Sequence, residues 1–286
     1  MNPHVQAFFD PDTFTVSYVV HDPASKKAAI IDPVLDFTPR NGRTSTRSAD
    51  ALLRFMDQEE LALEWLLETH AHADHLSAAH YLHEQTGAPI VIGSEIRQVQ
   101  RVFGALFEAD DVPPDGSAFG RLVSEGERLP LGALSIGILH TPGHTPACVT
   151  YLIGDAAFVG DTLFMPDYGT ARADFPGGDA ATLYRSIRKI LDLPPSTRIF
   201  VGHDYLPAGR TDYRWETTVA GQRAANIHVH DGVREADFVA MRTARDKTLE
   251  APQLILPSLQ VNIRAGAMPP PAPGGHVYLR LPVNAI

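Results

Sequence analysis

The chain has 286 residues, of which 44% are hydrophobic and 20% are charged, and this composition is typical of a globular protein with a substantial core. It therefore excludes disordered, collagen-like and mini-protein classes. Its 34 acidic and 24 basic residues give a formal net charge of −10, which disfavours a surface that binds nucleic acid or an anionic membrane. The 13 histidines are unusually many beside five methionines and two tryptophans.

The single cysteine, Cys148, cannot form an intramolecular disulfide, so a reducing compartment is expected. No lysine or arginine precedes Lys26 and no apolar run follows Met1, which predicts neither a secretory signal nor a transit peptide. Residues 131–154 lack charged side chains, but their histidines, prolines and glycines indicate two buried strands and a loop. These features predict a cytoplasmic protein without a membrane span.

The first half of the chain predicts strands interleaved with helices. Strands are expected over 5–9, 15–20, 28–31, 63–67 and 89–92, and helices over 48–59, 78–86 and 94–103. Ser48 and Ser94 are expected to cap their helices, and Gly87 to end the second one. Residues 112–120 contain proline and glycine and predict a loop.

The second half continues this pattern. Strands are expected over 134–139, 148–153, 157–159 and 199–201, and helices from the cap Asp179 to 191, over 215–226 and over 235–247. The proline-rich stretch 268–275 predicts a surface loop. We expect an α/β sandwich over residues 1–232, with a short helical C-terminal extension over 233–286 packed on the same domain.

The segment from Thr69 to His75 reads THAHADH and directly follows a predicted buried strand. Three histidines and Asp74 at this spacing can turn their side chains toward one metal ion or a close pair. Imidazole and carboxylate together suit Zn, Fe and Mn better than Ca or Mg. A solvated polar loop is the alternative, but clustering this many imidazoles without a partner is costly.

Three more segments place a histidine or an acid at a strand end. They are TPGHT at 141–145, VGDTL at 159–163 and FVGHD at 200–204, and they supply His144, Asp161 and His203. Each alone would more often be a capped turn or a buried histidine. Together, and in this order after the first segment, they indicate a metal site.

In this order the four segments resemble those of the metallo-β-lactamase superfamily, which implies an αββα sandwich. The resemblance covers residues 5–205. It implies one metal position at His70, His72 and His144, and a second at Asp74, His75 and His203. Asp161 would bridge the two, and a bridging hydroxide would then hydrolyse a carbonyl compound, as in glyoxalase II acting on acyl-glutathione thioesters.

A second resemblance is to the persulfide dioxygenases, in their bacterial rhodanese-associated subgroup. It rests on YGTARADF at 168–175, on HDY at 203–205, on Gln222, Arg223 and Asn226, and on LPS and NIRAG at 256–266. It implies one Fe(II) per chain, bound by His70, His144 and Asp161. His72, Asp74, His75 and His203 would then surround the iron without binding it.

This resemblance implies a dioxygenase that converts glutathione persulfide, O2 and water to sulfite and glutathione. Two imidazoles and one carboxylate leave three positions on the metal, enough for O2 and the persulfide sulfur. Glutathione carries two carboxylates, which arginine binds well. By resemblance, Arg172, Tyr205 and Arg223 contact it. Two departures, Ala171 in place of a cysteine and a longer segment at 206–214, leave the thiol specificity open.

Three alternatives remain. A dinuclear zinc thioesterase of the glyoxalase II type shares every ligand-type residue, although residues 235–247 do not show that group's basic glutathione clamp. A scaffold that docks a rhodanese-like or sulfide-oxidising partner is opposed by the complete set of ligands. A nucleic-acid-processing enzyme is opposed by the acidic charge. Zinc remains the alternative metal, since most nitrogen and oxygen sites prefer it to iron, and a homodimer is a candidate state.

Overall fold

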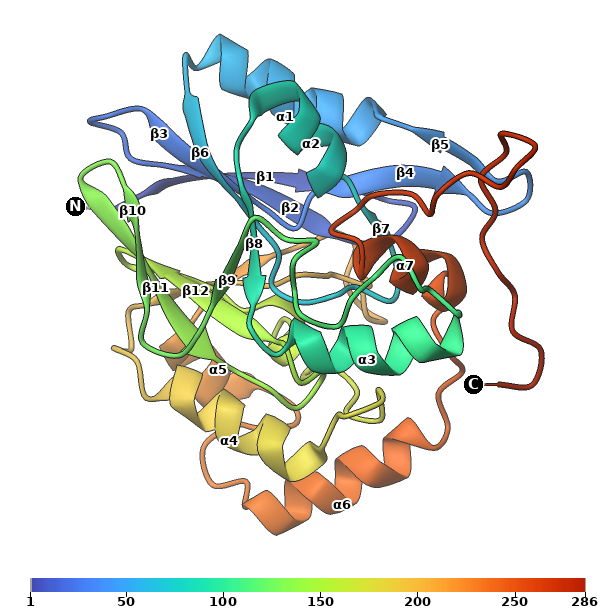
Figure 1. Cartoon of the computed structure of the whole chain (residues 1–286). Coiled ribbons are helices and arrows are strands. Elements are labelled where there is room, and N and C mark those ends of the chain that lie inside the picture. The colour runs from blue at the N-terminus through green and yellow to red at the C-terminus, as the bar shows by residue number, and fades with distance from the viewer. Residues whose placement is uncertain (1, 286) are drawn as a thin grey trace.

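Two six-stranded sheets pack face to face in the computed structural model, which describes residues 2–285 (Figure 1). In spatial order the first sheet contains β1 (His4–Phe9), β2 (Val16–His21), β3 (Lys27–Ile31), β6 (Ala62–Leu67), β8 (Ile90–Gly93) and β9 (Arg121–Val123). The second contains β10 (Arg128–Leu131), β11 (Leu134–His140), β12 (Val149–Ile153), β13 (Ala156–Phe158), β14 (Arg198–Phe200) and β15 (Glu216–Thr218). A small third sheet joins β5 (Arg43–Ser45), β4 (Val34–Thr38) and β7 (Leu76–Ser77).

Alternating side chains explain why both faces of the first sheet are buried. On β2, Tyr18 and Val20 face the second sheet, whereas Val19 faces the helices on the outside. Successive strand residues point to opposite faces, so a strand with six buried residues has to lie between two layers. From β3 to β9 the strands pair in parallel, which requires the helical connections seen between them.

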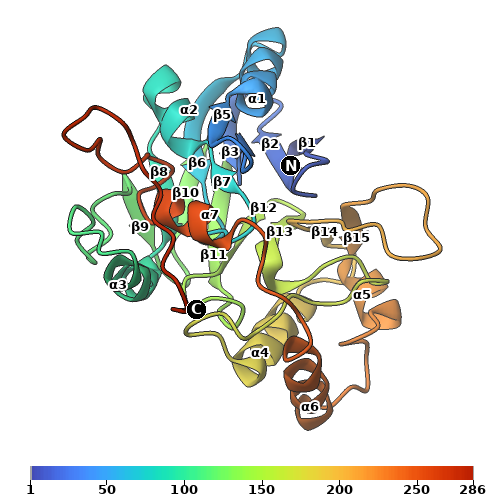
Figure 2. The same ribbon diagram turned by 90° about the vertical axis from the view of Figure 1, so that its right-hand side faces the viewer.

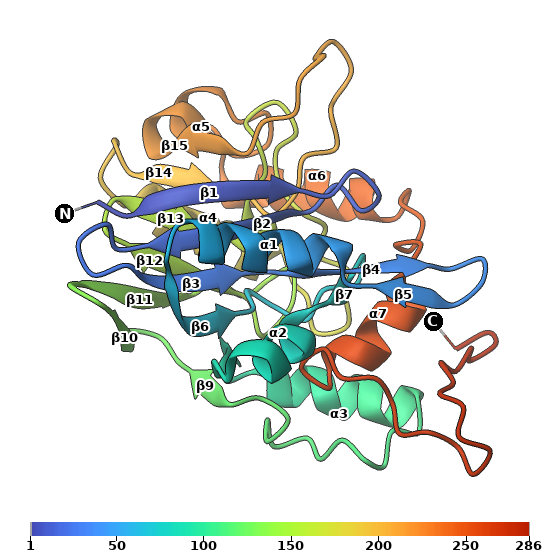
Figure 3. The same ribbon diagram turned by 90° about the horizontal axis from the view of Figure 1, so that it is seen from above.

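Helices cover the outer face of each sheet (Figure 1), and the view from above shows α1 (Arg47–Gln58) in front of the first sheet (Figure 3). The first sheet carries α1, α2 (Ala79–Thr86), α3 (Ile96–Leu106) and α7 (Ile255–Asn262). The second carries α4 (Ala180–Leu191), α5 (Val219–Ala225) and α6 (Glu235–Asp246). This arrangement confirms the predicted αββα sandwich of the metallo-β-lactamase type. The division of the chain at residues 232 and 233 stays a prediction, although α6 packs against α4 and α7 against β7.

Several predicted boundaries were wrong. Ser48 lies inside α1, where its hydroxyl donates to Asp36, and Glu95 takes the cap position expected for Ser94. The helix expected over 215–226 begins as strand β15, and Thr218 caps α5. Helix α7 was not predicted, because five of its eight residues are buried and its hydrophobic side chains therefore have no one-sided helical period.

The fold brings four strand ends to one edge of the sandwich. Strands β11, β13 and β14 run in the same direction in the second sheet, and β6 ends beside them in the first. The connection between β14 and β15 projects from the body near this edge, and the chain from α6 to α7 passes across it (Figure 2). Within residues 2–285, no helix is long and apolar enough to cross a membrane.

Candidate metal centre

The loop after β6 is fixed at its start by Asp32, the residue that follows β3. Asp32 adopts a positive φ of 48°, and its carboxylate accepts hydrogen bonds from the Thr69 backbone N–H at 2.7 Å and the Thr69 hydroxyl at 2.8 Å. The Thr69 hydroxyl also lies 3.0 Å from Nδ1 of His70. This contact leaves Nε2 of His70 available to a ligand.

The far end of the same loop is held by Asn262, at the end of α7. Its amide nitrogen donates to the carbonyl oxygens of His72 and His75, each at 2.8 Å, and its amide oxygen accepts from the Ser77 N–H at 2.8 Å. Asn262 is 4% exposed, so these three bonds are shielded from water. One buried side chain thus fixes the backbone that carries three of the clustered histidines.

His144 follows a tight turn between β11 and β12. Gly143 adopts φ +131° there, and a Cβ at this position would lie 2.3 Å from the Leu183 backbone. Nδ1 of His144 lies 2.8 Å from the carbonyl oxygen of Arg172, so Nδ1 carries the proton and Nε2 is free. The turn therefore needs glycine, and it aims Nε2 toward Asp161, 3.8 Å from Nε2 to Oδ2.

We expect the substitution G143A to destabilise the fold by about 2 to 4 kcal/mol, because it combines a strained φ with a backbone clash. Urea unfolding of the metal-free protein measures this effect. Gly104 lies inside α3, and a Cβ at this position would meet nothing within 4 Å, so G104A is the control and should raise stability by about 0.5 to 1 kcal/mol. Equal stability of G143A and the parent would contradict the close packing of this turn.

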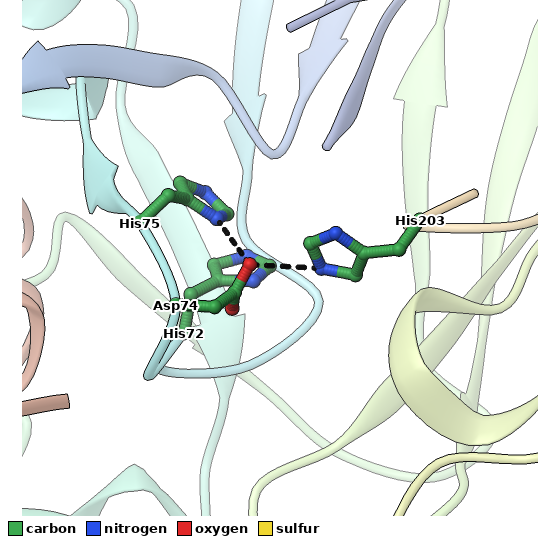
Figure 4. Close-up of side chains that lie close together, drawn as sticks. All are labelled: His72, Asp74, His75 and His203. Atoms are coloured by element: carbon green, nitrogen blue, oxygen red, sulfur yellow. Dashed lines mark hydrogen bonds and ion pairs between the residues drawn. The ribbon is translucent and has the colours of Figure 1, made fainter. Parts of the chain in front are cut away.

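Among the described residues, the histidines and acids form three groups that could each hold a metal, one of them made of Asp32, Glu68 and His72, and the other two adjoin. Ligand-type atoms of His70, His144 and Asp161 lie within 4.8 Å of one another, and so do those of His72, Asp74, His75 and His203. In the second group Oδ2 of Asp74 lies between two imidazoles, 3.4 Å from Nδ1 of His75 and 3.3 Å from Nε2 of His203 (Figure 4). The two groups touch, since Asp161 Oδ1 is 3.4 Å from His203 Nε2.

Two buried carboxylates, those of Asp32 and Glu68, contact one ring nitrogen of His72. Its Nε2 lies 3.0 Å from Oδ1 of Asp32 and 3.4 Å from Oε2 of Glu68. Its other ring nitrogen, Nδ1, has no hydrogen-bond partner among the described residues, so it remains available to a metal. Asp161 groups with His70 and His144, as expected for a residue that adjoins both metal positions.

Burial and neighbouring charges set the protonation of the cluster. Burial lowers the pKa of His70 well below its ordinary value, with His72 and His144 adding to the effect, so His70 is neutral as a metal ligand must be. Burial alone would raise the pKa of Asp74, but His203 and His75 hold it well below its ordinary value. Burial alone would lower the pKa of His72, yet Asp32 and Glu68 raise it well above.

Several buried polar atoms of the cluster have no hydrogen-bond partner among the described residues, which tests whether the residues fit a cation. They include Nε2 of His75 and Oδ1 of Asp161. A buried polar atom without a partner is costly, and a metal ion would satisfy it. Neutral imidazoles and ionised carboxylates are also the donors that Fe(II) and Zn(II) accept. The residues therefore fit a transition metal, whose identity they do not fix.

A cavity of about 360 Å³ opens beside His144 and Asp161. Tyr205 and Arg172 line it, and the Tyr205 ring stacks on His203 with centroids 5.5 Å apart. Burial raises the pKa of Tyr205 well above its ordinary value, so it remains a phenol. Arg223 does not line the cavity, and its guanidinium pairs with Asp231 at 3.1 Å on the surface, so the geometry gives no support to its predicted contact with a thiol.

Arg172 lines the cavity but its donors are engaged elsewhere. Nε and Nη2 donate to the Asp174 carboxylate at 2.5 and 2.7 Å, and Nη1 donates to the carbonyl oxygen of Glu250 at 2.6 Å. Its carbonyl oxygen meanwhile orients His144. Contact between Arg172 and a substrate stays a prediction, and its observed bonds join the metal centre to the segment after α6.

Sequence reasoning missed Asp32 and Glu68. Asp32 directly follows a strand, as Asp161 nearly does, so the same strand-end argument could have found it. Glu68 stands beside the histidine segment, but a glutamate there carries no distinctive signal. Asn262 belongs to one of the segments that carry the second resemblance, yet its three bonds to a loop 187 residues away cannot be read from spacing.

Comparison with known proteins identifies a family and several named relatives. A family model described as the metallo-beta-lactamase superfamily matches residues 10–203. A "probable metallo-hydrolase" of Burkholderia pseudomallei is 55% identical, with 99% of both chains covered. "Glyoxylase B2" of Dictyostelium discoideum is 47% identical, covering 98% of this chain and 97% of that one.

Three further proteins carry other names. The mitochondrial "persulfide dioxygenase ETHE1" of the mouse is 31% identical over 94% of this chain and 91% of its own. The crystal structure of ETHE1 from Myxococcus xanthus matches with a TM-score of 0.74 at 29% identity, over 92% of this chain and all of that one. A "beta-lactamase hydrolase-like protein" of Xylella fastidiosa is 51% identical, and this chain spans 65% of its length.

Proposed function

This chain belongs to the metallo-β-lactamase superfamily, and we propose that it is a mononuclear Fe(II) dioxygenase that oxidises glutathione persulfide. The observation that carries the proposal is the set of His70, His144 and Asp161, two imidazoles and one carboxylate whose ligand-type atoms lie within 4.8 Å of one another. Two imidazoles and one carboxylate are the ligands of a large group of iron oxygenases. The relatives named persulfide dioxygenase support the same assignment.

The chain's own residues prepare this site before any substrate arrives. Thr69 and the Arg172 carbonyl each engage an Nδ1 atom, so both Nε2 atoms of His70 and His144 are presented to the metal. When bound there, Fe(II) supplies open coordination positions for O2 and the persulfide sulfur. Phe164, Leu249 and Leu254 supply apolar surface to the cavity lining beside these polar groups.

The overall reaction is balanced without another oxidant. Glutathione persulfide, O2 and water give sulfite, glutathione and two protons. The outer sulfur atom is oxidised, O2 is reduced, and the bond between the two sulfurs breaks. The Tyr205 phenol stays protonated in the cavity, so it can donate a hydrogen bond to an anionic sulfur or oxygen atom.

The test is anaerobic loading with iron followed by oxygen uptake. We expect one iron per chain, one O2 consumed per glutathione persulfide, and sulfite as product. The same protein loaded with zinc should consume no O2. Two zinc ions per chain as isolated, with no O2 uptake by the iron-loaded protein, would overturn the proposal.

The second candidate is a dinuclear zinc hydrolase of the glyoxalase II type. The second set, His72, Asp74, His75 and His203, favours it because it could hold another metal. The names of the more similar relatives also favour a hydrolase. Hydrolysis of lactoylglutathione by the two-zinc protein, at a rate comparable with persulfide oxidation, would decide for this function.

We propose that the enzyme is cytoplasmic. Because persulfides are reactive thiol derivatives, we also propose that it acts beside a rhodanese-like or other sulfide-oxidising protein. A homodimer is the proposed oligomeric state. Sedimentation of the purified chain with and without such a partner measures both.

A further inference from the structure

The cavity beside the metal centre is also lined by α6 and the turn after it. Arg245 and Glu250 line it together with His144 and Asp161. The cavity of about 360 Å³ is near the lower limit for small-molecule sites, which suits a tripeptide better than a larger substrate. One compact molecule can therefore reach from the metal centre to α6.

Three arginines line this cavity among residues 2–285, and their hydrogen bonding separates them. Arg172 is engaged by Asp174 and by the Glu250 carbonyl, and Arg242 is 1% exposed and engaged by Asp246 and the Thr170 carbonyl. The Arg245 guanidinium makes no hydrogen bond or ion pair with any described residue. Arg245 is thus the cation that remains available to a ligand.

Glu250 supplies a negative charge to the same cavity lining. Its carboxylate also has no ion pair or hydrogen bond within the described chain, so it is more than 4.0 Å from the Arg245 nitrogens. Two unlike charges that line one cavity without pairing leave space for a group that carries both charges. The α-amino acid end of a thiol such as glutathione, with one ammonium and one carboxylate, has this chemistry.

Buried contacts attach the end of α6, which carries Arg245, to the metal centre. The Asp246 carboxylate accepts from the Ala173 N–H at 2.9 Å, and Arg242 donates to the Thr170 carbonyl at 3.2 Å, so the end of α6 is attached to segment 170–174. That segment holds His144 through the Arg172 carbonyl, and Arg172 also holds the Glu250 backbone. Segment 170–174 is therefore bonded both to the metal-site residue His144 and to the part of the chain that carries Arg245 and Glu250.

We infer that Arg245 and Glu250 bind the α-amino acid end of the thiol, Arg245 its carboxylate and Glu250 its ammonium, and so select thiols that carry this group. The inference rests on the proposed function, because it takes a persulfide or thioester of glutathione as the substrate. Both residues are specificity determinants and neither reaches the reacting sulfur.

The test measures initial rates with glutathione persulfide and with its N-acetylated form, which lacks the ammonium. R245Q should raise KM for glutathione persulfide by about 10- to 100-fold with little change in kcat, since it removes a charge-assisted pair. E250Q should raise KM for glutathione persulfide but not for the N-acetyl compound, because the ammonium is already absent there. K247Q removes an equal charge from the same helix end, outside the cavity lining, and should leave KM unchanged.

The possible results distinguish a failure of this inference from a failure of the proposed dioxygenase function. Turnover by the parent protein with unaltered KM in R245Q and E250Q would overturn the assignment of Arg245 and Glu250 to thiol binding. The proposed dioxygenase function would stand. No turnover of any persulfide by the parent would overturn the dioxygenase. In that case the same variants are assayed with lactoylglutathione. An unchanged KM in both variants would then overturn the assignment of Arg245 and Glu250 to thiol binding as well. Circular dichroism melting of each variant checks that the fold is retained.

Discussion

The substitution H144A is expected to remove bound iron and to lower O2 uptake with glutathione persulfide by more than about 100-fold. Replacing residues that only orient metal ligands already costs about 10- to 100-fold in affinity or activity, so loss of a ligand should cost more. The physical reason is the loss of one of two imidazoles from a set whose atoms lie within 4.8 Å. Iron content per chain and oxygen consumption measure the two effects separately.

His80 provides the control for H144A. It lies on α2 close to the metal loop in sequence, its side chain is 42% exposed, and its contact in the described chain is Glu84. H80A should keep both iron and activity. Full iron content and full O2 uptake in H144A would remove His144 from the centre and sink the mononuclear assignment.

The substitution N262D should loosen the metal loop from a distance. It keeps the oxygen that accepts from Ser77 but sets a carboxylate oxygen against the carbonyl oxygens of His72 and His75, 2.8 Å from the present nitrogen. Loss of two buried donors should reduce stability by about 3 kcal/mol. Metal affinity should fall by about 10- to 100-fold, as for other residues that orient ligands.

A competing chelator measures the affinity, and urea unfolding measures the stability. N41D makes the same chemical change at an exposed asparagine whose amide oxygen accepts from the Arg43 N–H, so it should leave both quantities unchanged. N262D that binds metal as tightly as the parent would show that α7 covers the loop without positioning it.

The ligand-type residues could be found from sequence because each stands at or just after a strand end. His70, Asp161 and His203 follow buried apolar runs, and such runs are the strongest local signal in a sandwich of two sheets. The segments are also short, so spacing within each one determines which side chains share a loop. For these reasons the four histidine and aspartate segments can be located without knowledge of the fold.

Pairing between distant residues could not be read in the same way. Arg172, Arg223 and Arg245 look alike in sequence, but one is engaged by Asp174, one by Asp231, and one has no partner in the described chain. The position of His72 depends on Asp32, which is brought beside it by strand pairing. Tertiary contacts decide which charge is available to a ligand, and no local pattern reports them.

The bond from Asn262 to the metal loop also sets an order of events during protein synthesis. His75 leaves the ribosome 187 residues before Asn262. At about 5 to 20 residues per second this separation amounts to roughly 10 to 40 seconds. During that interval the nascent loop has all its histidines but lacks the side chain that holds its backbone. The loop can therefore reach the geometry described above only after α7 has emerged.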